Sequence, residues 1–583
     1  MFNKDDITKC FPMDSYRKGQ KETIEKIIDA FNSGKKFVIL EAPTGSGKSV
    51  IGKTIANMVP STCYITSQIM LQEQLISEFG ANGKYQVGPP MIHLKGRSNY
   101  NCVYPDICNL PIAKRAQLKA KKMSCANGPC KQDNKSMCNE CRIDPNKVLD
   151  NIQKDISNPD YTPTGLEAAS IQRVIELEDE TMDIRALKAN LCPYWQRVGE
   201  FLDARIGLMN FKSFLFQCAF SGYFEKFHTN LMIVDEAHNQ EKELLDFVGM
   251  TFTDKLMIEA LGIKMPTLKS AAEYAEWFKK NGIAKRFFNE VAIARSQERM
   301  KDAQEYDNLA EKINYFVASD HDRWVTKVDN SGRHKKVEIK PIYVRNEAQQ
   351  WLYDRADKVL MMSATILSAQ VMCDSLGISQ DDVEFIQLPN YFPIENREIH
   401  FMPAGSMSWK NKAKTLPLML KQIEEIVNIH DGQKGIIHTH NFQIANFIVE
   451  NGSAELRARL IYQKNFESKD IMLQAHEDSD DGIIIAPAMH EGLDLKDELS
   501  RFQILCKMPY PNFKEDPQLE ARMKLSQGYY DWLVCLKLIQ SYGRSIRSDK
   551  DYANTYILDE DFSRLYSKAG HLLPGWFKEA IVK

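Results

Sequence analysis

A glycine-rich segment near the N-terminus contains the residue types needed to hold phosphate. Residues 37–50 read FVILEAPTGSGKSV, in which a continuous apolar run leads into a glycine turn and then Lys48 and Ser49. Glycines in such a turn let backbone N–H groups close around phosphate oxygens, and the following helix N-terminus adds positive dipole. Lys48 would contact the β- and γ-phosphates of a nucleotide, and Ser49 would bind Mg²⁺. The residues expected to surround the phosphates are Thr44, Gly45, Ser46, Gly47, Lys48 and Ser49, with Ala42 in the place where the general pattern has its first glycine.

Two acidic residues follow another apolar run. Asp235 and Glu236 come directly after LMIV, at the carboxyl end of an expected strand, where open parallel sheets bind ligands. Asp235 could hold the Mg²⁺ that bridges the nucleotide phosphates, and Glu236 could orient or deprotonate an attacking water. Acids in this position are also common as simple helix caps, so the hydrolytic interpretation depends on the phosphate segment.

A basic segment near the C-terminus could complete such a site. Residues 540–547 read QSYGRSIR, in an expected helical stretch, so that Arg544 and Arg547 would share one helix face. Arginines reaching across a cleft stabilise charge on a γ-phosphate, and Gln540 would accompany them. The alternative is a solvated basic face.

The cysteines are unevenly distributed. Six of the 13 fall between Cys102 and Cys141, and Cys192 stands apart. In a reducing compartment such clustering indicates metal rather than disulfides. Cys125, Cys130, Cys138 and Cys141 could form a structural zinc site, and four thiolates can equally hold a [4Fe–4S] cluster.

The elements that would position these residues form two α/β blocks. Buried strands are expected at 37–40, 231–234, 358–366, 435–441 and 482–495, which indicates two doubly wound lobes with insertions between them. The pattern from about 250 to 320 is helical, and a hairpin follows with its turn at Asn330-Ser331-Gly332. Helices are also expected within the first 35 residues and over 570–583.

Composition is that of a soluble globular protein of several domains, with 583 residues, 43% hydrophobic and 26% charged. No apolar run approaches the roughly 18 residues that cross a bilayer, and the N-terminus MFNKDDITKC lacks a signal-peptide core. We therefore expect a cytoplasmic location and no membrane partner. Because the net charge is −3, a nucleic-acid site would have to be a local basic groove.

Together, GSGKS, DEAH, SAT (363–365), HEGLDL (490–495) and QSYGRSIR resemble the motif set of superfamily 2 helicases. The finer resemblance is to the XPD and DinG branch, of bacterial or phage type. GRSNYNC resembles the lead-in to that branch's first cluster cysteine, Cys141-Arg142 its third, and ALKANLCPYWQRVGEFLDARIGLMNFKSFL its last-cysteine segment. The resemblance covers nearly the whole chain and is weakest over 105–180 and 250–330.

The resemblance implies a role for each motif. Lys48, Ser49, Asp235 and Glu236 would bind and hydrolyse ATP with Mg²⁺, completed by Gln540, Arg544 and Arg547 from the second lobe. Ser363-Ala364-Thr365 would couple nucleotide state to lobe movement. Further contacts to nucleotide or DNA are implied for Arg17 and Gln20 on the adenine side, and for Gly492 and Asp494.

The resemblance also implies a [4Fe–4S] cluster, with zinc as the alternative. Cys102, Cys141 and Cys192 match best. Cys130 is chosen as the fourth ligand, and Cys125 and Cys138 stay open.

The implied fold is α/β, with two RecA-like parallel-sheet lobes and two insertions in the first lobe. Its expected segments are 1–95, 201–244 and 346–390 for the first lobe, 96–200 for the cysteine-rich insertion, 245–345 for a helical arch, and 391–583 for the second lobe. The implied activity is ATP-dependent unwinding of forked DNA by 5′→3′ movement on single-stranded DNA, by a monomer. Rival hypotheses are a translocase that does not separate strands and an ATP-switched DNA-binding scaffold. Expected DNA contacts are Thr66, Ser67, Gln68, Lys95, Arg97, Lys121 and Lys122.

Overall fold

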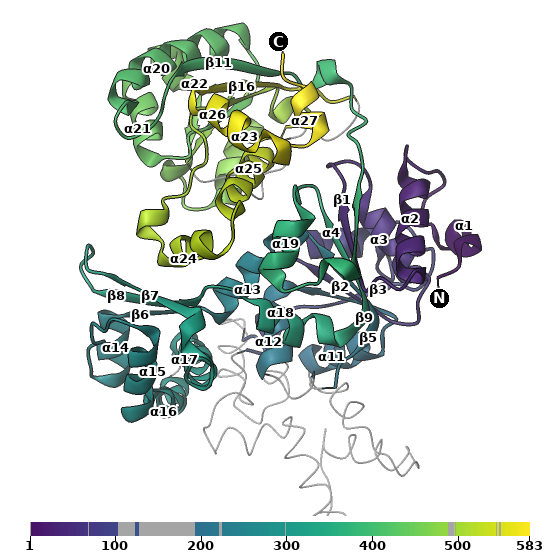
Figure 1. The fold of residues 1–583 in the computed structure, drawn as a ribbon, viewed down its shortest axis with the longest axis vertical. Coiled ribbons are helices and arrows are strands. Elements are labelled where there is room, and N and C mark those ends of the chain that lie inside the picture. Colours follow the sequence, from purple (N-terminus) through teal and green to yellow (C-terminus); the bar gives the residue numbers. More distant parts are fainter. Residues whose placement is uncertain are drawn as a thin grey trace, which may run out of the picture.

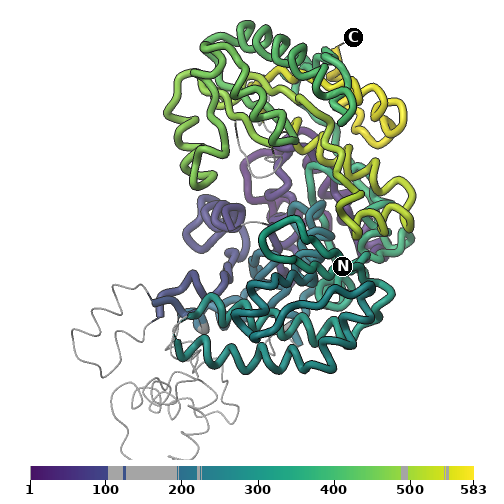
Figure 2. Tube along the Cα trace, turned by 90° about the vertical axis from the view of Figure 1, so that its left-hand side faces the viewer, coloured from purple at the N-terminus to yellow at the C-terminus, as the bar shows by residue number. Residues whose placement is uncertain are grey.

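The computed structural model describes residues 2–67, 69–102, 123–126, 193–220, 224, 226–297, 299–487, 495, 497–543, 545–546 and 550–582. Two sheets, each made of parallel strands, follow one another along the long axis of the molecule, and a helical segment lies beside the first (Figure 1). Turned by 90°, Figure 2 shows the same division, with the purple-to-teal N-terminal part below and the green-to-yellow C-terminal part above. The predicted α/β class with two RecA-like lobes is confirmed.

The first lobe contains a seven-stranded sheet in which every pair of neighbouring strands is parallel. Its order is β10 (Val383–Gln387), β1 (Phe37–Glu41), β9 (Ala356–Ser363), β5 (Thr229–Asp235), β2 (Thr62–Thr66), β4 (Ile206–Asn210) and β3 (Met91–Leu94). Its helices are α1 (Ile7–Cys10), α2 (Gln20–Asn32), α3 (Lys48–Asn57), α4 (Ile69–Phe79), α11 (Pro193–Asp203), α12 (Phe211–Phe220), α13 (Gln240–Val248), α18 (Arg345–Trp351) and α19 (Ala369–Leu376).

Alternation along β1 explains why its apolar run is continuous. Phe37 and Ile39 belong to the hydrophobic cluster on one face of the sheet, whereas Val38 and Leu40 belong to the cluster on the other. A strand covered on both faces needs apolar residues at every position, because successive side chains point to opposite sides.

The second lobe contains a six-stranded parallel sheet. Its order is β11 (Ile399–Gly405), β16 (Asn554–Asp559), β15 (Phe502–Leu505), β12 (Gly435–His438), β14 (Ile483–Ala486) and β13 (Leu460–Tyr462). Its helices are α20 (Lys412–Ile429), α21 (Phe442–Asn451), α22 (Ala454–Arg459), α23 (Lys469–Asp478), α24 (Pro517–Leu525), α25 (Tyr529–Tyr542), α26 (Asp561–Ala569) and α27 (Gly575–Glu579).

Between β5 and β9 the chain leaves the first sheet and forms a separate helical unit. It consists of α14 (Asp254–Leu261), α15 (Ala271–Lys280), α16 (Ile283–Ser296) and α17 (Met300–Ala318), with an antiparallel sheet of β6 (Met250–Thr253), β8 (Lys336–Pro341) and β7 (Trp324–Asp329). The predicted helices and hairpin are therefore present. The sequence does not predict the strand β6. Only Met250 and Phe252 are buried in its four residues, and so short an alternation of buried and exposed residues does not distinguish a strand from a helix.

Two predictions about helices near the C-terminus are wrong. The helix expected over 570–583 is broken by Pro574, so that only α27 is regular and Ile581 instead bridges to Ile399. The helix carrying Gln540 ends at Tyr542, with Gly543 as its C-cap, and Ser545 and Ile546 are not helical. The helix predicted over 540–547 is therefore absent at 545–546, and the predicted pairing of Arg544 and Arg547 on one helix face falls on residues outside those described.

Candidate nucleotide site and comparisons with known proteins

The phosphate loop lies between β1 and α3, as its sequence predicts. Gly45 and Gly47 have positive φ angles of 81° and 83°, which residues with a Cβ rarely adopt. Lys48 begins α3, and its ammonium donates to the carbonyl of Ala42 at 3.0 Å, which folds the side chain back over the loop. The hydroxyl of Ser46 is buried and has no hydrogen-bond partner among the described residues. A phosphate oxygen in the loop would supply that partner, so the loop fits a nucleotide.

Arg17 and Gln20 contact this loop from the start of α2. The Arg17 guanidinium donates to the carbonyl of Gly45, and the Gln20 amide donates to the carbonyl of Gly47 at 3.3 Å. Tyr391, which the sequence did not single out, lies beside them, with the Lys18 ammonium 4.8 Å from its ring centroid. The residues expected on the adenine side thus contact the phosphate loop itself.

Asp235 ends β5 and is buried next to the loop. Its carboxylate accepts from the Tyr64 hydroxyl at 3.2 Å and from the backbone N–H of Glu236 at 3.0 Å. Burial, reinforced by the Glu236 carboxylate, raises the pKa of Asp235 to about 6, although the Lys48 ammonium opposes the shift. A buried carboxylate at the end of β5 and a serine hydroxyl in the first turn of α3 are both oxygen donors of the kind that Mg²⁺ prefers. The donor set of Asp235 and Ser49 therefore fits the ion.

Glu236 is half-buried and adopts a left-handed conformation with φ 51°. Few non-glycine residues adopt this region, and such outliers concentrate at functional sites. The turn directs the chain into α13, and it brings His238 Nδ1 to 3.4 Å from the Glu236 carboxylate and 2.6 Å from the Ser363 hydroxyl. The acidic motif and the SAT segment are therefore in direct contact.

Glu41 joins the phosphate loop to the two residues that follow the SAT segment, Ile366 and Leu367, and sequence reasoning missed it. Its buried carboxylate accepts from the backbone N–H groups of Ile366 at 2.6 Å and of Leu367. Burial raises the pKa of Glu41, while these two donors act against the shift. A glutamate directly before the loop was the available signal, but only the tertiary structure shows which backbone it anchors.

Several predicted residues cannot be compared with the structure. Gln540 is buried near the end of α25, whereas Asp494, Gly492, Arg544, Arg547, Cys130, Cys138, Cys141, Cys192, Gln68, Lys121 and Lys122 lie outside the described residues. Among the described residues, no group of three or more histidine, cysteine or acidic side chains could hold a metal.

Cys102 and Cys125 do lie on facing chain segments. Asn101 and Ser124 form an antiparallel bridge, and the backbone N–H of Cys125 donates to Tyr100 O at 2.8 Å. The backbone N–H of Cys102 donates to Met123 O, also at 2.8 Å. These pairings place Cys102 and Cys125, which are 23 positions apart in sequence, on adjacent chain segments, and the Cys125 thiol donates to the carbonyl of Asn101 at 3.5 Å.

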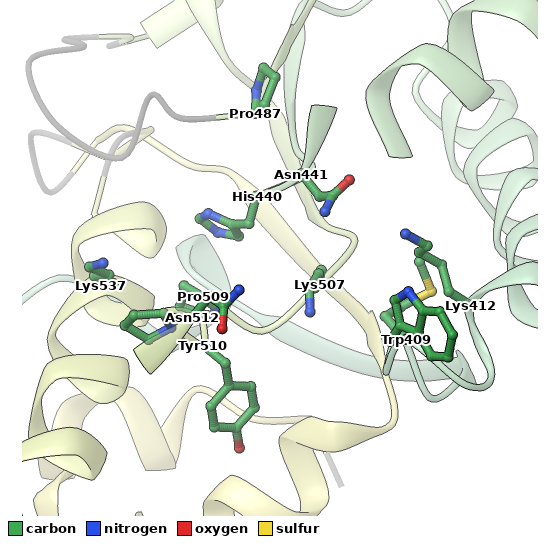
Figure 3. Close-up of a pocket in the computed structure, with 12 residues that line it drawn as sticks. Trp409, Lys412, His440, Asn441, Pro487, Lys507, Pro509, Tyr510, Asn512 and Lys537 are labelled. Carbon is green, nitrogen blue, oxygen red and sulfur yellow. The ribbon is translucent and has the colours of Figure 1, made fainter. Parts of the chain in front are cut away.

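A cavity of about 620 Å³ opens in the second lobe, at the carboxyl ends of β11, β12, β14 and β15 (Figure 3). Figure 3 shows Trp409 and Lys412 on one side, His440 and Asn441 above, and Lys537 on the opposite side. The Trp409 side chain is 88% exposed, although apolar side chains of that size are usually covered. The residues that line the cavity are Met407, Trp409, Lys412, His440, Asn441, Pro487, Lys507, Pro509, Tyr510, Pro511, Asn512 and Lys537. An exposed indole beside three lysines suits an anionic, aromatic ligand.

No helix among the described residues has the length and apolar character needed to span a membrane. The cytoplasmic location stays a prediction.

Comparisons with known proteins agree with this geometry. Residues 423–580 match the family model of the helicase C-terminal domain, and residues 14–121 match that of the type III restriction enzyme res subunit. The ATP-dependent DNA helicase DinG of Photobacterium profundum is 26% identical over 269 residues, which cover 42% of this chain and 38% of that protein. The mouse ATP-dependent DNA helicase DDX11 is 31% identical over 112 residues, or 17% of this chain and 12% of that protein. The matched segments thus span less than half of these relatives.

Solved structures extend the likeness to the whole fold. An XPD helicase structure covers 96% of this chain and 98% of its own, with a TM-score of 0.58 and 14% identity. The structure of Xpd4 of S. tokodaii covers 97% of this chain and 99% of its own, with a TM-score of 0.51 and 13% identity. The chain is thus similar to superfamily 2 helicases of the XPD/DinG type in its helicase C-terminal match and its DinG and DDX11 likeness, and its fold resembles that of the XPD structures.

Proposed function

We propose that this chain is a DNA helicase that hydrolyses ATP to move along single-stranded DNA and separate the strands of a fork. The observation that carries the proposal is the contact between three segments of the first lobe. The phosphate loop, the Asp235-Glu236 turn and the SAT segment are joined through Glu41 and His238. Hydrolysis at the loop can therefore act directly on the segment that leads toward the second lobe.

In the proposed reaction, the backbone N–H groups of residues 45–49 bind the phosphates, and Lys48 neutralises their charge. Asp235 and Ser49 would hold Mg²⁺, which would supply stabilisation of the negative charge on the phosphates. Glu236 orients the attacking water and accepts its proton. Gln540, Arg544 and Arg547 would complete the site from the second lobe, and Arg17 and Gln20 the adenine side.

We propose that single-stranded DNA crosses both lobes. On the first lobe the candidates are Thr66, Ser67, Lys95 and Arg97. On the second lobe the cavity around Trp409 is the candidate, because base stacking on an indole and phosphate contacts from lysines bind a strand without reading its sequence. The direction of movement, 5′→3′, and the six segment boundaries given above are part of the same proposal.

We also propose a [4Fe–4S] cluster. The bridge described above supports Cys125 as a ligand beside Cys102, and Cys130, which the sequence prediction chose, and Cys138 stay as alternatives. Cys141 and Cys192 would supply the other thiolates. Iron and zinc content and visible absorption of anaerobically purified protein test this. Cys125→Ser is expected to lose most of the iron, whereas Cys218→Ser, a buried cysteine elsewhere, keeps it. A colourless wild-type protein that contains only zinc would overturn the cluster.

The test of the main proposal is unwinding of forks with a 5′ or a 3′ tail, measured together with ATP turnover. Wild-type protein should hydrolyse ATP faster with single-stranded DNA and unwind the 5′-tailed fork. Lys48→Ala should lower turnover about 100-fold or more, whereas Lys21→Ala, an exposed lysine on α2, should leave it unchanged. DNA-stimulated turnover without unwinding would favour the translocase, and nucleotide binding without turnover would favour the switched scaffold.

A further inference from the structure

Helix α24 belongs to the second lobe by sequence but packs on the first lobe and on the helical insertion. It follows β15 in the chain, yet Figure 1 shows it below the second sheet, near α13 and the β7–β8 hairpin. The Gln518 amide donates to the carbonyl of Ile342 at 3.0 Å, and the Ser526 hydroxyl donates to the Asp374 carboxylate at 2.9 Å. Both ends of the helix are thus held by residues outside its own lobe.

Arg522, in the middle of this helix, forms a buried ion pair across the lobe boundary. Its side chain is fully buried, with Nε 3.2 Å from the Glu241 carboxylate and Nη2 2.6 Å from the Ser375 hydroxyl. The guanidinium lies between two rings, 3.8 Å from the Tyr343 centroid and 4.3 Å from that of Tyr529. The Tyr529 hydroxyl also donates to Glu241, at 3.0 Å.

The position of Glu241 depends on the nucleotide site, because Glu241 lies in the first turn of α13, directly after the turn that holds Asp235 and Glu236. A shift of that turn would move the start of α13. Arg522 Nη1 also lies 3.7 Å from the Asp374 carboxylate, near the end of α19. Because separating a buried ion pair is unfavourable, a movement of Glu241 favours a movement of Arg522 and its helix in the same direction.

A second link joins α25 to Ile366, the residue directly after the SAT segment. The Trp532 indole N–H donates to the carbonyl of Ile366 at 2.8 Å, and the backbone N–H of the same Ile366 donates to Glu41. Leu367 is packed in the hydrophobic cluster of the second lobe, together with Trp532. Farther along this helix, Gln540 lies near its C-terminal end. One helix therefore connects the SAT segment with the residue expected at the far side of the nucleotide.

We propose that α24 and the first half of α25 transmit the nucleotide state of the first lobe to the second, with Arg522 and Trp532 as positioning residues. The inference rests on the proposed function, because it takes ATP as the ligand of the loop. The two links start from different segments of the nucleotide site and end 10 positions apart, at Arg522 and Trp532, so both reach the second lobe through two consecutive helices.

The test is Trp532→Phe, which keeps an aromatic ring and removes the indole N–H. Trp576→Phe is the matched control, because Trp576 stacks on Tyr542 within the second lobe. We expect Trp532→Phe to retain DNA-stimulated ATP turnover within about twofold but to unwind about three- to tenfold fewer base pairs per ATP, the range expected for one hydrogen bond. Tyr529→Phe should act in the same direction, and the control should change neither quantity.

Hydrogen exchange gives a readout that does not depend on turnover. Addition of a non-hydrolysable ATP analogue should change exchange in α24 and α25 of the wild-type protein, and Trp532→Phe should reduce that change. If the analogue binds but leaves these helices unaffected, or if turnover and unwinding fall in parallel, the linkage is wrong. Wild-type protein without DNA-stimulated turnover would instead overturn the proposed function, while the exchange experiment still decides the linkage.

Discussion

At the scale of single residues, Asp235 makes the folded protein's stability depend on pH. Its pKa of about 6 in the folded protein lies above the ordinary 3.8, because burial and Glu236 disfavour the charged form. Between these two values the folded protein retains a proton that the unfolded chain has lost. The stability of the metal-free protein therefore falls as the pH rises from about 4 to about 6, and it stays lower at neutral pH.

Asp235→Asn removes this cost and keeps an acceptor for Tyr64. We expect the metal-free variant to be more stable than wild type at pH 7.5, by up to about 3 kcal/mol, and the gain to be smaller at pH 5. Thermal denaturation with EDTA at both pH values measures it. Asp382→Asn, at an exposed position, should be neutral within about 0.5 kcal/mol. A variant less stable than wild type at pH 7.5 would contradict the assignment.

At the scale of elements, the loop between β11 and α20 presents Trp409 to solvent at the carboxyl edge of the second sheet. Trp409→Ala should weaken single-stranded DNA binding by about tenfold or more, since stacking one base contributes about 1–3 kcal/mol. Ile429→Ala is the control, because Ile429 is 70% exposed at the other end of α20. Fluorescence anisotropy with a labelled oligonucleotide compares them, and equal affinities would exclude this loop from the DNA path.

The lysines of the same cavity are expected to act through phosphate. Replacing Lys507 with Ala should lower affinity for oligonucleotides of any sequence and reduce the slope of log affinity against log salt by about one. Titrations at several salt concentrations, with a poly-dT and a mixed-sequence strand, give both quantities. An unchanged salt slope would show that Lys507 makes no phosphate contact.

At the scale of the whole molecule, the sequence predicts the strands and loops that are set by short stretches of residues, and it does not predict contacts between distant residues. The strands β1 and β5 and the loop before Lys48 are recognisable because apolar runs, glycines and acids follow one another at short range. The Glu41–Ile366 and Arg522–Glu241 contacts join residues 325 and 281 positions apart, and no local pattern marks them. The Trp409 cavity is likewise formed by loops after four separate strands. The absence of helix at 545–546 has a local cause, since Gly543 caps α25 directly after Tyr542.

The same long-range contacts predict that the two lobes stabilise each other. Arg522 and Glu241 are both buried, and loss of one partner leaves an uncompensated charge that costs about 3–5 kcal/mol. We therefore expect Arg522→Met to lower the melting temperature by several degrees and to separate one cooperative transition into two in scanning calorimetry. The separation follows because the sheet of each lobe has a hydrophobic core of its own.

Lys524 provides the control on the same helix. Its ion pair with Glu520 is exposed on both sides and contributes at most about 1 kcal/mol, so Lys524→Met should leave the transition unchanged. Saturating nucleotide should raise the first-lobe transition of Arg522→Met and leave the second-lobe transition in place, whereas in wild type both should rise together. If Arg522→Met still unfolds in one transition that nucleotide shifts as in wild type, the lobes are coupled by other contacts, and α24 does not join them.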